Sequence, residues 1–153
     1  MPNPNPEYIR ELIETMNTCP YFEHMFMRLS EVALDRAVLE MKTDRRHVQA
    51  FGIVHGGVLA TLIDAATFFA CFMRIPEETG MVNIDLKLNY LKAVQDGSSL
   101  TVEGSAIHSG NSISYAEATV YNEFRKPVAH GASTLLTLQG KGIKLRSPKF
   151  FDQ

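Results

Sequence analysis

Asp64 lies near the middle of a mainly apolar stretch, Val58 to Met73, whose residues recur at helical spacing. An ionised carboxylate that is buried without a partner costs several kcal/mol. Asp64 therefore has either a structural role, paired with a basic side chain or with backbone N–H groups, or a chemical role as a general base or nucleophile. The carboxylate alone leaves both interpretations open, and the residues before the stretch favour the chemical one.

His55, Gly56 and Gly57 come directly before this stretch, at the predicted start of the helix. Free N–H groups at a helix N-terminus favour a developing negative charge, and glycines let a carbonyl group approach them closely. This is the arrangement of an oxyanion hole, in which one donor typically contributes about 3 kcal/mol. A sharp turn with positive φ would also explain the glycines, and His55 alone would serve for packing or capping.

The spacing between these two features predicts a site shared by two chains. At about 1.5 Å per residue, Asp64 lies roughly 10 Å along the helix from Gly57. One helix cannot easily bring both residues to a single reacting carbon, whereas two antiparallel copies in a dimer can. We therefore expect a homo-oligomer in which one subunit supplies the oxyanion donors and the other supplies the carboxylate.

The elements that position these residues form one α+β domain over residues 1–153, with an antiparallel sheet curled around one long helix. They are predicted in this order: a helical extension within 1–20, a hairpin within 25–42, a polar loop at 43–50, the long helix at 55–72, and strands at about 82–90, 100–108, 112–121 and 128–138.

Three of these segments carry a specific expectation about burial. The helix at 55–72 is apolar nearly all round, so we expect other elements to enclose it. Residues 82–90 alternate apolar and polar side chains, which predicts one continuous strand. The tail at 141–153 carries Lys141, Lys144, Arg146 and Lys149, and we expect it to be a solvated basic tail.

Composition excludes several classes of protein. The chain of 153 residues has 15 basic and 17 acidic side chains, which argues against a nucleic-acid binder working by bulk charge. Cys19 and Cys71 are too few for a disulfide scaffold, and no metal-ligand spacing surrounds them. The apolar run is shorter than the roughly 20 residues of a membrane span, and no secretory signal precedes it. We expect a cytoplasmic protein with no membrane or nucleic-acid partner and no metal.

The string HGGVLATLIDAA at 55–66 resembles the signature of the hot-dog acyl-CoA thioesterases of the phenylacetate-pathway and thioesterase-superfamily-member-2 type. The similarity runs from about Glu23 to Leu138 and includes the strand at 82–90, the Asp96-Gly97 turn and Ser109-Gly110-Asn111. The resemblance implies the hot-dog fold and hydrolysis of an acyl-CoA to a free acid and CoA. It implies no cofactor apart from the CoA of the substrate, and a dimer that pairs into a dimer of dimers.

The resemblance also implies roles for particular residues. Asp64 acts as nucleophile or as base for water, the N–H of Gly57 polarises the thioester carbonyl, and Gln49, before the HGG turn, helps to hold substrate or water. With His55, these three residues are the predicted catalytic residues. Asn83 stands where the family often has a Ser or Thr that assists the water. The remaining predicted substrate-binding residues are Gly56, Tyr90, Leu91, Lys92, His108, Ser109, Gly110, Asn111 and Ser112.

Two of these positions depart from the family pattern. Asn83 offers an amide in place of a hydroxyl, which changes how water would be activated. Asn111 stands where a basic residue often grips the CoA phosphates, leaving Lys92 as the candidate phosphate partner; Arg45, Arg46 or the basic tail could add charge. An ordinary solvated lysine would explain Lys92 equally well, and a solvated loop and tail explain Arg45, Arg46 and the basic tail better than phosphate binding does.

Two other functions compete with thioester hydrolysis. A hot-dog hydratase or dehydratase would pair a His with an acid farther along the helix, and residues 65–72 contain no acid. A non-catalytic acyl-CoA binding or sensing protein would lack the carboxylate or carry a DNA-binding segment, and this chain retains Asp64. A nucleotide phosphate cradle is set aside, because neither glycine-rich phosphate motif is present. The sequence leaves the acyl group open between an aryl-acetyl group and a medium or long fatty acyl chain.

Overall fold

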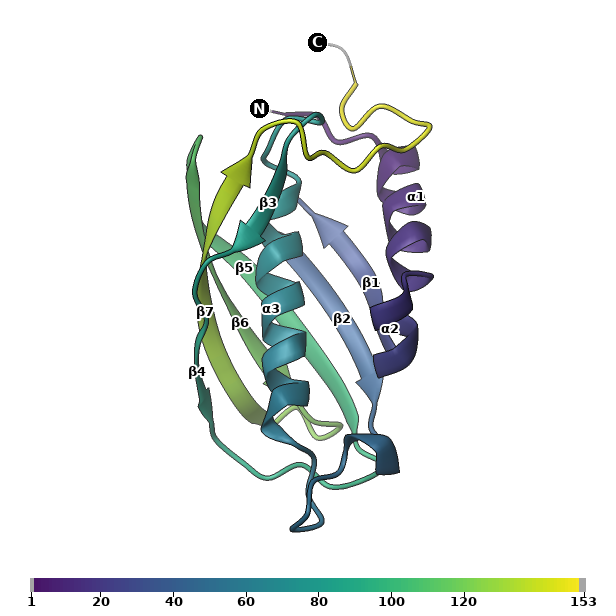
Figure 1. The fold of residues 1–153 in the computed structure, drawn as a ribbon, viewed down its shortest axis with the longest axis vertical. Helices are drawn as coiled ribbons and strands as arrows, with labels where there is room; N and C mark the ends of the chain where they lie inside the picture. The colour runs from purple at the N-terminus through teal and green to yellow at the C-terminus, as the bar shows by residue number, and fades with distance from the viewer. Residues whose placement is uncertain (1, 152–153) are drawn as a thin grey trace.

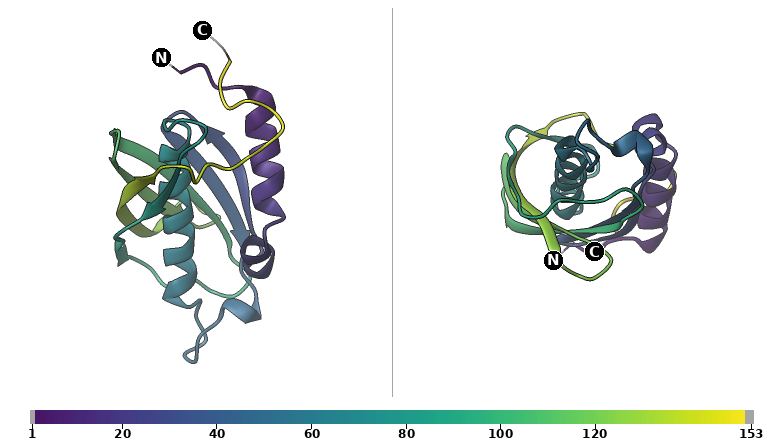
Figure 2. Two further views of the ribbon diagram at one scale, coloured as in Figure 1. Left: turned by 45° about the horizontal axis from the view of Figure 1, so that its top comes forward. Right: turned by 90° about the horizontal axis from the view of Figure 1, so that it is seen from below.

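The central helix α3 (Gly56–Phe72) lies in the concave face of a seven-stranded antiparallel sheet in the computed structural model, which describes residues 2–151 (Figure 1). Viewed along the helix, the sheet curls around α3 (Figure 2). The predicted α+β architecture is confirmed. The strands run in the order β1 (Met27–Ala33), β2 (Arg36–Lys42), β5 (Ser99–Ser109), β6 (Ile113–Tyr121), β7 (Pro127–Leu138) and β3 (Gly80–Asn83), and β4 (Lys87–Tyr90) also pairs with β7.

The sheet encloses α3 on one side only. The side chains that face the sheet are buried and form the core with the inward-facing residues of the strands; they include Leu62, Ile63, Ala66, Phe69 and Ala70. The opposite stripe of the helix, at helical spacing, is exposed or half-buried and comprises Gly57, Ala60, Thr61, Asp64 and Phe68. The expectation of a fully enclosed helix is therefore wrong for the single chain. We call these five residues the open stripe of α3.

The strand predicted at 82–90 is interrupted at residues 84–86. Asn83 pairs with Leu135, and Lys87 pairs with Ala132. The first strand thus advances by four residues where β7 advances by three, and the extra residue forms a β-bulge. The Asp85 carboxylate accepts the Thr134 N–H at 2.7 Å and holds the bulge in place. The bulge changes which side chains face inward: Val82 and Ile84 are exposed, whereas Leu86 and Leu88 pack on the core.

The N-terminal extension contains two helices. The predicted helix is confirmed as α1 (Pro6–Asn17), and its Asn5 cap accepts the Glu7 N–H at 3.0 Å. The Asn17 amide then exchanges two hydrogen bonds with the backbone of Leu29, which occupies part of the edge of β1. A second short helix, α2 (Pro20–Met25), was not predicted, because six residues are too few to show a helical period. It lies beside α1 and β1 in Figure 1.

The C-terminal tail packs over the end of α3. Lys141, Lys144 and Arg146 are exposed as expected, but Lys149 is wholly buried. Its ammonium donates to the carbonyl oxygens of Phe72 and Ile75 at 2.6 and 2.8 Å and so caps the C-terminal end of the helix. Burial lowers the pKa of Lys149 to about 7. No helix within residues 2–151 has the length and apolar character that crossing a membrane requires.

Candidate active site

Asp64 stands at the centre of the open stripe, and its carboxylate has no partner among residues 2–151: it accepts no hydrogen bond and pairs with no cation there. The structural alternative, in which a basic side chain or backbone N–H groups hold the carboxylate, finds no support in this chain. Apolar neighbours desolvate the group and raise the pKa of Asp64 above its ordinary value. An unpaired carboxylate with a raised pKa is suited to act as a base.

A small polar network fixes the turn of α3 that carries Asp64. The Thr67 hydroxyl lies 2.9 Å from the carbonyl oxygens of both Ile63 and Asp64. The Asn83 amide donates to Thr67 Oγ1 at 3.1 Å and to Ser133 Oγ at 2.7 Å, and lies 3.4 Å from the Asp64 carbonyl oxygen. Asn83 therefore lies beside Asp64 as expected, but its N–H donors are directed at these groups and not at the carboxylate.

The turn before α3 has an ordinary backbone. Gly56 and Gly57 have negative φ, so positive φ does not explain the glycines. His55 is the N-cap, and its Nδ1 accepts the Gly57 N–H at 2.8 Å. A Cβ on Gly56 would lie 2.8 Å from Cζ and from the hydroxyl oxygen of Tyr90, so glycine is needed here for close contact with an aromatic ring.

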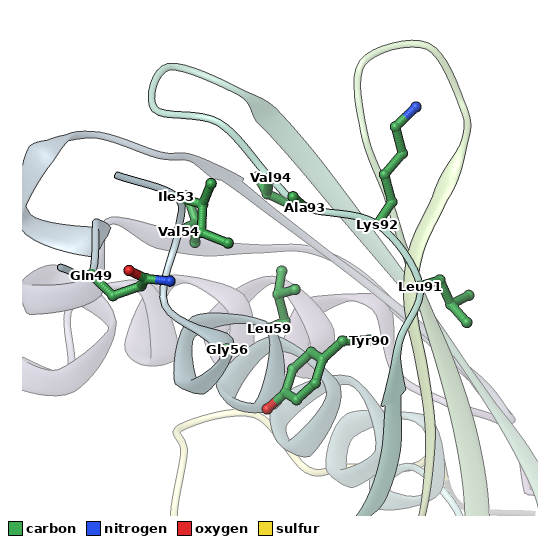
Figure 3. Close-up of a pocket in the computed structure, with 10 residues that line it drawn as sticks. All are labelled: Gln49, Ile53, Val54, Gly56, Leu59, Tyr90, Leu91, Lys92, Ala93 and Val94. Carbon is green, nitrogen blue, oxygen red and sulfur yellow. The ribbon is translucent and has the colours of Figure 1, made fainter. Parts of the chain in front are cut away.

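A pocket at the start of α3 gathers five of the predicted residues. This cavity of about 430 Å³ is lined by Gln49, Ile53, Val54, Gly56, Leu59, Tyr90, Leu91, Lys92, Ala93 and Val94. Figure 3 shows the Tyr90 ring over Gly56 and the Gln49 side chain across the opening, with Lys92 extending away from the helix. The Gln49 amide oxygen accepts the Phe51 N–H, which holds that side chain beside the pocket.

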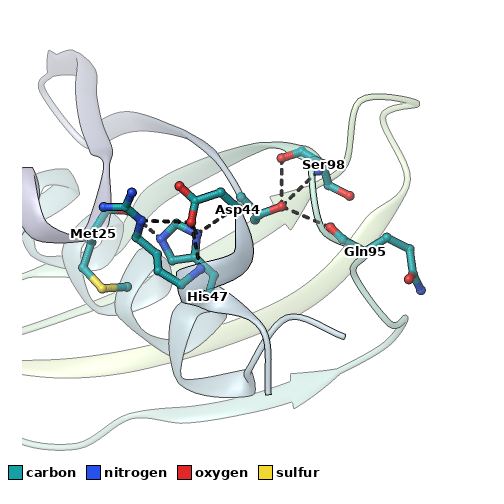
Figure 4. A network of polar contacts seen from close by, with 7 residues as sticks. Met25, Asp44, His47, Gln95 and Ser98 are labelled. Carbon is teal, nitrogen blue, oxygen red and sulfur yellow. Dashed lines mark hydrogen bonds and ion pairs between the residues drawn. The ribbon is translucent and has the colours of Figure 1, made fainter. Parts of the chain in front are cut away.

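A buried histidine, missed by the sequence analysis, anchors the loop that carries Gln49 (Figure 4). His47 ends the short 3-10 helix η1 (Arg45–His47), and its Nδ1 accepts the Asp44 N–H at 2.9 Å. Its Nε2 therefore donates to the Met25 carbonyl oxygen at 3.0 Å, at the end of α2. The His47 carbonyl oxygen accepts the His55 N–H at 2.8 Å. The His47 side chain thus ties α2 to this loop, and its backbone carbonyl ties the loop to the start of α3.

The second group of predicted substrate-binding residues lies at the other end of the molecule. His108 and Ser109 end β5, and Gly110, Asn111 and Ser112 form the β5–β6 turn, near the C-terminal end of α3 (Figure 1). The Cys71 thiol of α3 is buried in the core, and this burial raises its pKa to about 11. A single chain therefore does not bring this turn and the Gly56–Tyr90 pocket to one ligand.

A further hollow of about 350 Å³ lies directly against Asp64. Its lining consists of Tyr21, Phe22, Met27, Ala60, Thr61, Asp64, Ala65 and Leu86. Tyr21 was missed because no sequence signal links α2 to α3; the structure joins them through a hydrogen bond of 2.8 Å between the Tyr21 and Thr61 hydroxyls. Within residues 2–151 no group of three or more His, Cys, Asp or Glu side chains is placed to hold a metal ion.

The comparison with known families agrees with the resemblance read from the sequence. The family model of the thioesterase superfamily matches residues 51–131, a segment that includes Asp64 and every residue lining the Gly56–Tyr90 pocket except Gln49. Among curated proteins, the human acyl-coenzyme A thioesterase 13 is 26% identical over 129 residues, which cover 82% of this chain and 91% of that protein.

Solved structures share the fold. A thioesterase from Haemophilus influenzae superposes with a TM-score of 0.81 at 22% identity, covering 95% of this chain and 100% of that one. A Streptococcus mutans protein bound to acetyl-CoA superposes with a TM-score of 0.69 at 20% identity, covering 74% of this chain and 90% of that one. The predicted hot-dog fold is confirmed by these likenesses.

Proposed function

Because the chain belongs to the thioesterase superfamily, we propose that it hydrolyses acyl-CoA thioesters to the free acid and CoA at Asp64, in a site shared by two subunits. The observation that carries the proposal is the unpaired Asp64 carboxylate at the centre of the open stripe of α3. The human relative named acyl-coenzyme A thioesterase and the acetyl-CoA-bound Streptococcus mutans structure support the choice of substrate.

The reaction needs few groups, because a thioester is already activated and its thiolate leaves readily. As general base, Asp64 takes a proton from water while the water oxygen attacks the carbonyl carbon. As nucleophile, its oxygen forms an acyl anhydride that water then cleaves. On either route the C–S bond breaks, the CoA thiolate leaves and takes up a proton, and N–H donors stabilise the oxyanion. No metal or cofactor enters this chemistry apart from the CoA of the substrate.

The oxyanion donor is proposed to be the Gly57 N–H of a second subunit. The open stripe of α3 includes both Gly57 and Asp64, so a second copy of the same helix packed on it would meet both residues. In an antiparallel pair, Gly57 of one chain comes close to Asp64 of the other. The same pairing brings the β5–β6 turn of one chain toward the Gly56–Tyr90 pocket of the other, so that both groups of predicted residues contact one CoA. We propose that this homodimer is the active unit.

The decisive experiment is thiol release from a panel of acyl-CoAs by wild type, Asp64→Asn and Asp64→Ala. We expect wild type to turn over some members and both variants to lose most of the rate, while circular dichroism and size-exclusion chromatography show an unchanged fold and oligomer. Variants as active as wild type would refute the role of Asp64. Acyl-CoA binding without hydrolysis by wild type would instead support a non-catalytic binding or sensing protein.

A further inference from the structure

The hollow beside Asp64, which we call the acyl hollow, has an apolar lining. Apart from Asp64 it contains no charged side chain, and its apolar lining residues are Phe22, Met27, Ala60, Ala65 and Leu86. Its volume of about 350 Å³ lies near the lower limit of the roughly 300–1,000 Å³ found for ligand pockets. An uncharged, compact group attached to a carbonyl at Asp64 fits such a space.

A second and larger hollow lies on the other side of the same wall. This outer hollow of about 690 Å³ runs between α1, α2 and β1 and is lined by Ile13, Glu14, Asn17, Thr18, Phe22, Glu23, Phe26, Met27 and Arg28. Phe22 and Met27 line both hollows. Both side chains are nearly buried, at 8% and 4% exposure, so they form a packed partition between the two spaces.

The partition is held firmly in place. The Phe22 ring packs edge-on against Phe69 of α3, with the ring centroids 6.3 Å apart. The Tyr21–Thr61 hydrogen bond ties the same short helix to α3, one turn before Asp64. At the other end of α2, the buried His47 donates to the Met25 carbonyl oxygen. Contacts before and after Phe22 thus fix the distance between α2 and the carboxylate.

We infer that the acyl hollow receives the acyl group of the substrate and that Phe22 and Met27 set its maximum length. This inference rests on the proposed function, because it takes Asp64 as the reacting carboxylate. The substrate class that fits is a medium-chain aliphatic or single-ring acyl group, whereas a long chain meets the partition. Removal of the Met27 side chain should join the two hollows and lengthen the space open to an acyl chain toward α1.

The test compares kcat/KM for hexanoyl-, octanoyl-, phenylacetyl- and palmitoyl-CoA. We expect wild type to prefer octanoyl- or phenylacetyl-CoA over palmitoyl-CoA. Met27→Ala should raise the palmitoyl-to-octanoyl ratio of kcat/KM by about tenfold or more, on the scale by which pocket length discriminates between acyl groups. The ratio is compared because a general loss of stability lowers kcat/KM for palmitoyl-CoA and for octanoyl-CoA together and leaves their ratio unchanged.

Met41→Ala is the matched control. Met41 pairs directly with Met27 across the β1–β2 hairpin and is equally buried, at 4% exposure, but it lines neither of the two hollows. Its variant should keep the wild-type ratio. If the alanine variants do not fold, Met27→Val and Met41→Val make the same comparison with a residue suited to strands.

The outcomes separate the two claims. If wild type is active and neither Met27→Ala nor Met27→Val changes the palmitoyl-to-octanoyl ratio of kcat/KM, the partition does not limit acyl length. The thioesterase proposal would then still stand. An equal shift in the Met41 variants also overturns it. A wild type that hydrolyses no member of the panel overturns the proposed function itself.

Discussion

The Gly57 N–H donates to His55 Nδ1 at 2.8 Å, so the expected oxyanion donor is already bonded to the histidine that precedes the helix. A thioester carbonyl must share or replace this bond to be polarised by Gly57. The geometry gives His55 a clear local role, because its side chain satisfies one of the free N–H groups that begin every helix. This hydrogen bond supports a capping role for His55 more directly than a catalytic role.

His55→Ala should therefore reduce stability by about 1 kcal/mol, the usual effect of losing an N-cap, whereas His55→Asn should retain most of it. We expect kcat/KM of both variants to stay within about tenfold of wild type, because the proposed donor is a backbone group. Thermal or urea unfolding and thiol release measure the two effects. A loss of activity as large as that of Asp64→Ala would show that the imidazole takes part in catalysis.

Gly56→Ala should impair substrate binding more than stability. The added Cβ meets the far end of the Tyr90 side chain, which is 58% exposed and free to swing away. We expect KM for the acyl-CoA to rise while the free energy of unfolding changes by less than about 1 kcal/mol. The double variant with Tyr90→Ala tests the cause, since Gly56→Ala should then have little further effect on KM. If Gly56→Ala raises KM by the same factor with and without the Tyr90 side chain, the contact between the two residues is not the cause.

The candidate site could be proposed from the sequence because single residues indicate it. Asp64 is a carboxylate within an apolar helix, and two glycines stand at the start of that helix. The approximate positions of the strands follow from alternation and turn residues, which are local, although six strands are predicted and seven are present. The bulge at residues 84–86 could not be predicted, because alternation continues through it and only the register with β7 reveals it.

Features that depend on contacts between distant segments were missed. Nothing in residues 20–25 shows that Tyr21 reaches Thr61, and nothing in the basic tail shows that Lys149 enters the core. The open stripe of α3 could not be predicted from the sequence, for a different reason. Ala60 and Phe68 are apolar whether their own sheet or another chain covers them, so hydrophobicity cannot tell the two cases apart.

Activity should rise with pH through a value above the ordinary pKa of an aspartate, because burial raises the pKa of Asp64 and only the ionised form is a base. The contribution of Asp64 to the stability of the fold should change with pH in the opposite direction. A folded-state pKa above the unfolded one means that the contribution of the protonated carboxyl is lost as pH rises through the folded-state pKa. Asp64→Asn should thus gain stability relative to wild type over that window.

Profiles of kcat/KM from about pH 4 to pH 9 and parallel unfolding curves measure both effects for Asp64. A flat activity profile would contradict the raised pKa. A wild type that gains stability relative to Asp64→Asn as pH rises would show that the carboxylate has a stabilising partner in the assembled protein.

Lys149→Met should destabilise the protein, and more so at alkaline pH. The variant loses both hydrogen bonds to the carbonyl oxygens of Phe72 and Ile75, a loss of about 2 kcal/mol. Burial lowers the pKa of Lys149 to about 7, against about 10.4 in the unfolded chain. Between these values the unfolded state holds a proton that the folded state lacks, so the stability of wild type rises with pH and that of the variant does not.

Urea unfolding of wild type and Lys149→Met at pH values between about 6 and 10 measures this difference, which should widen as pH increases. Lys144→Met is the control, since Lys144 lies on the same tail but is exposed, and its stability should follow that of wild type throughout. A difference that stays constant or narrows with pH would show that Lys149 remains charged while it caps α3.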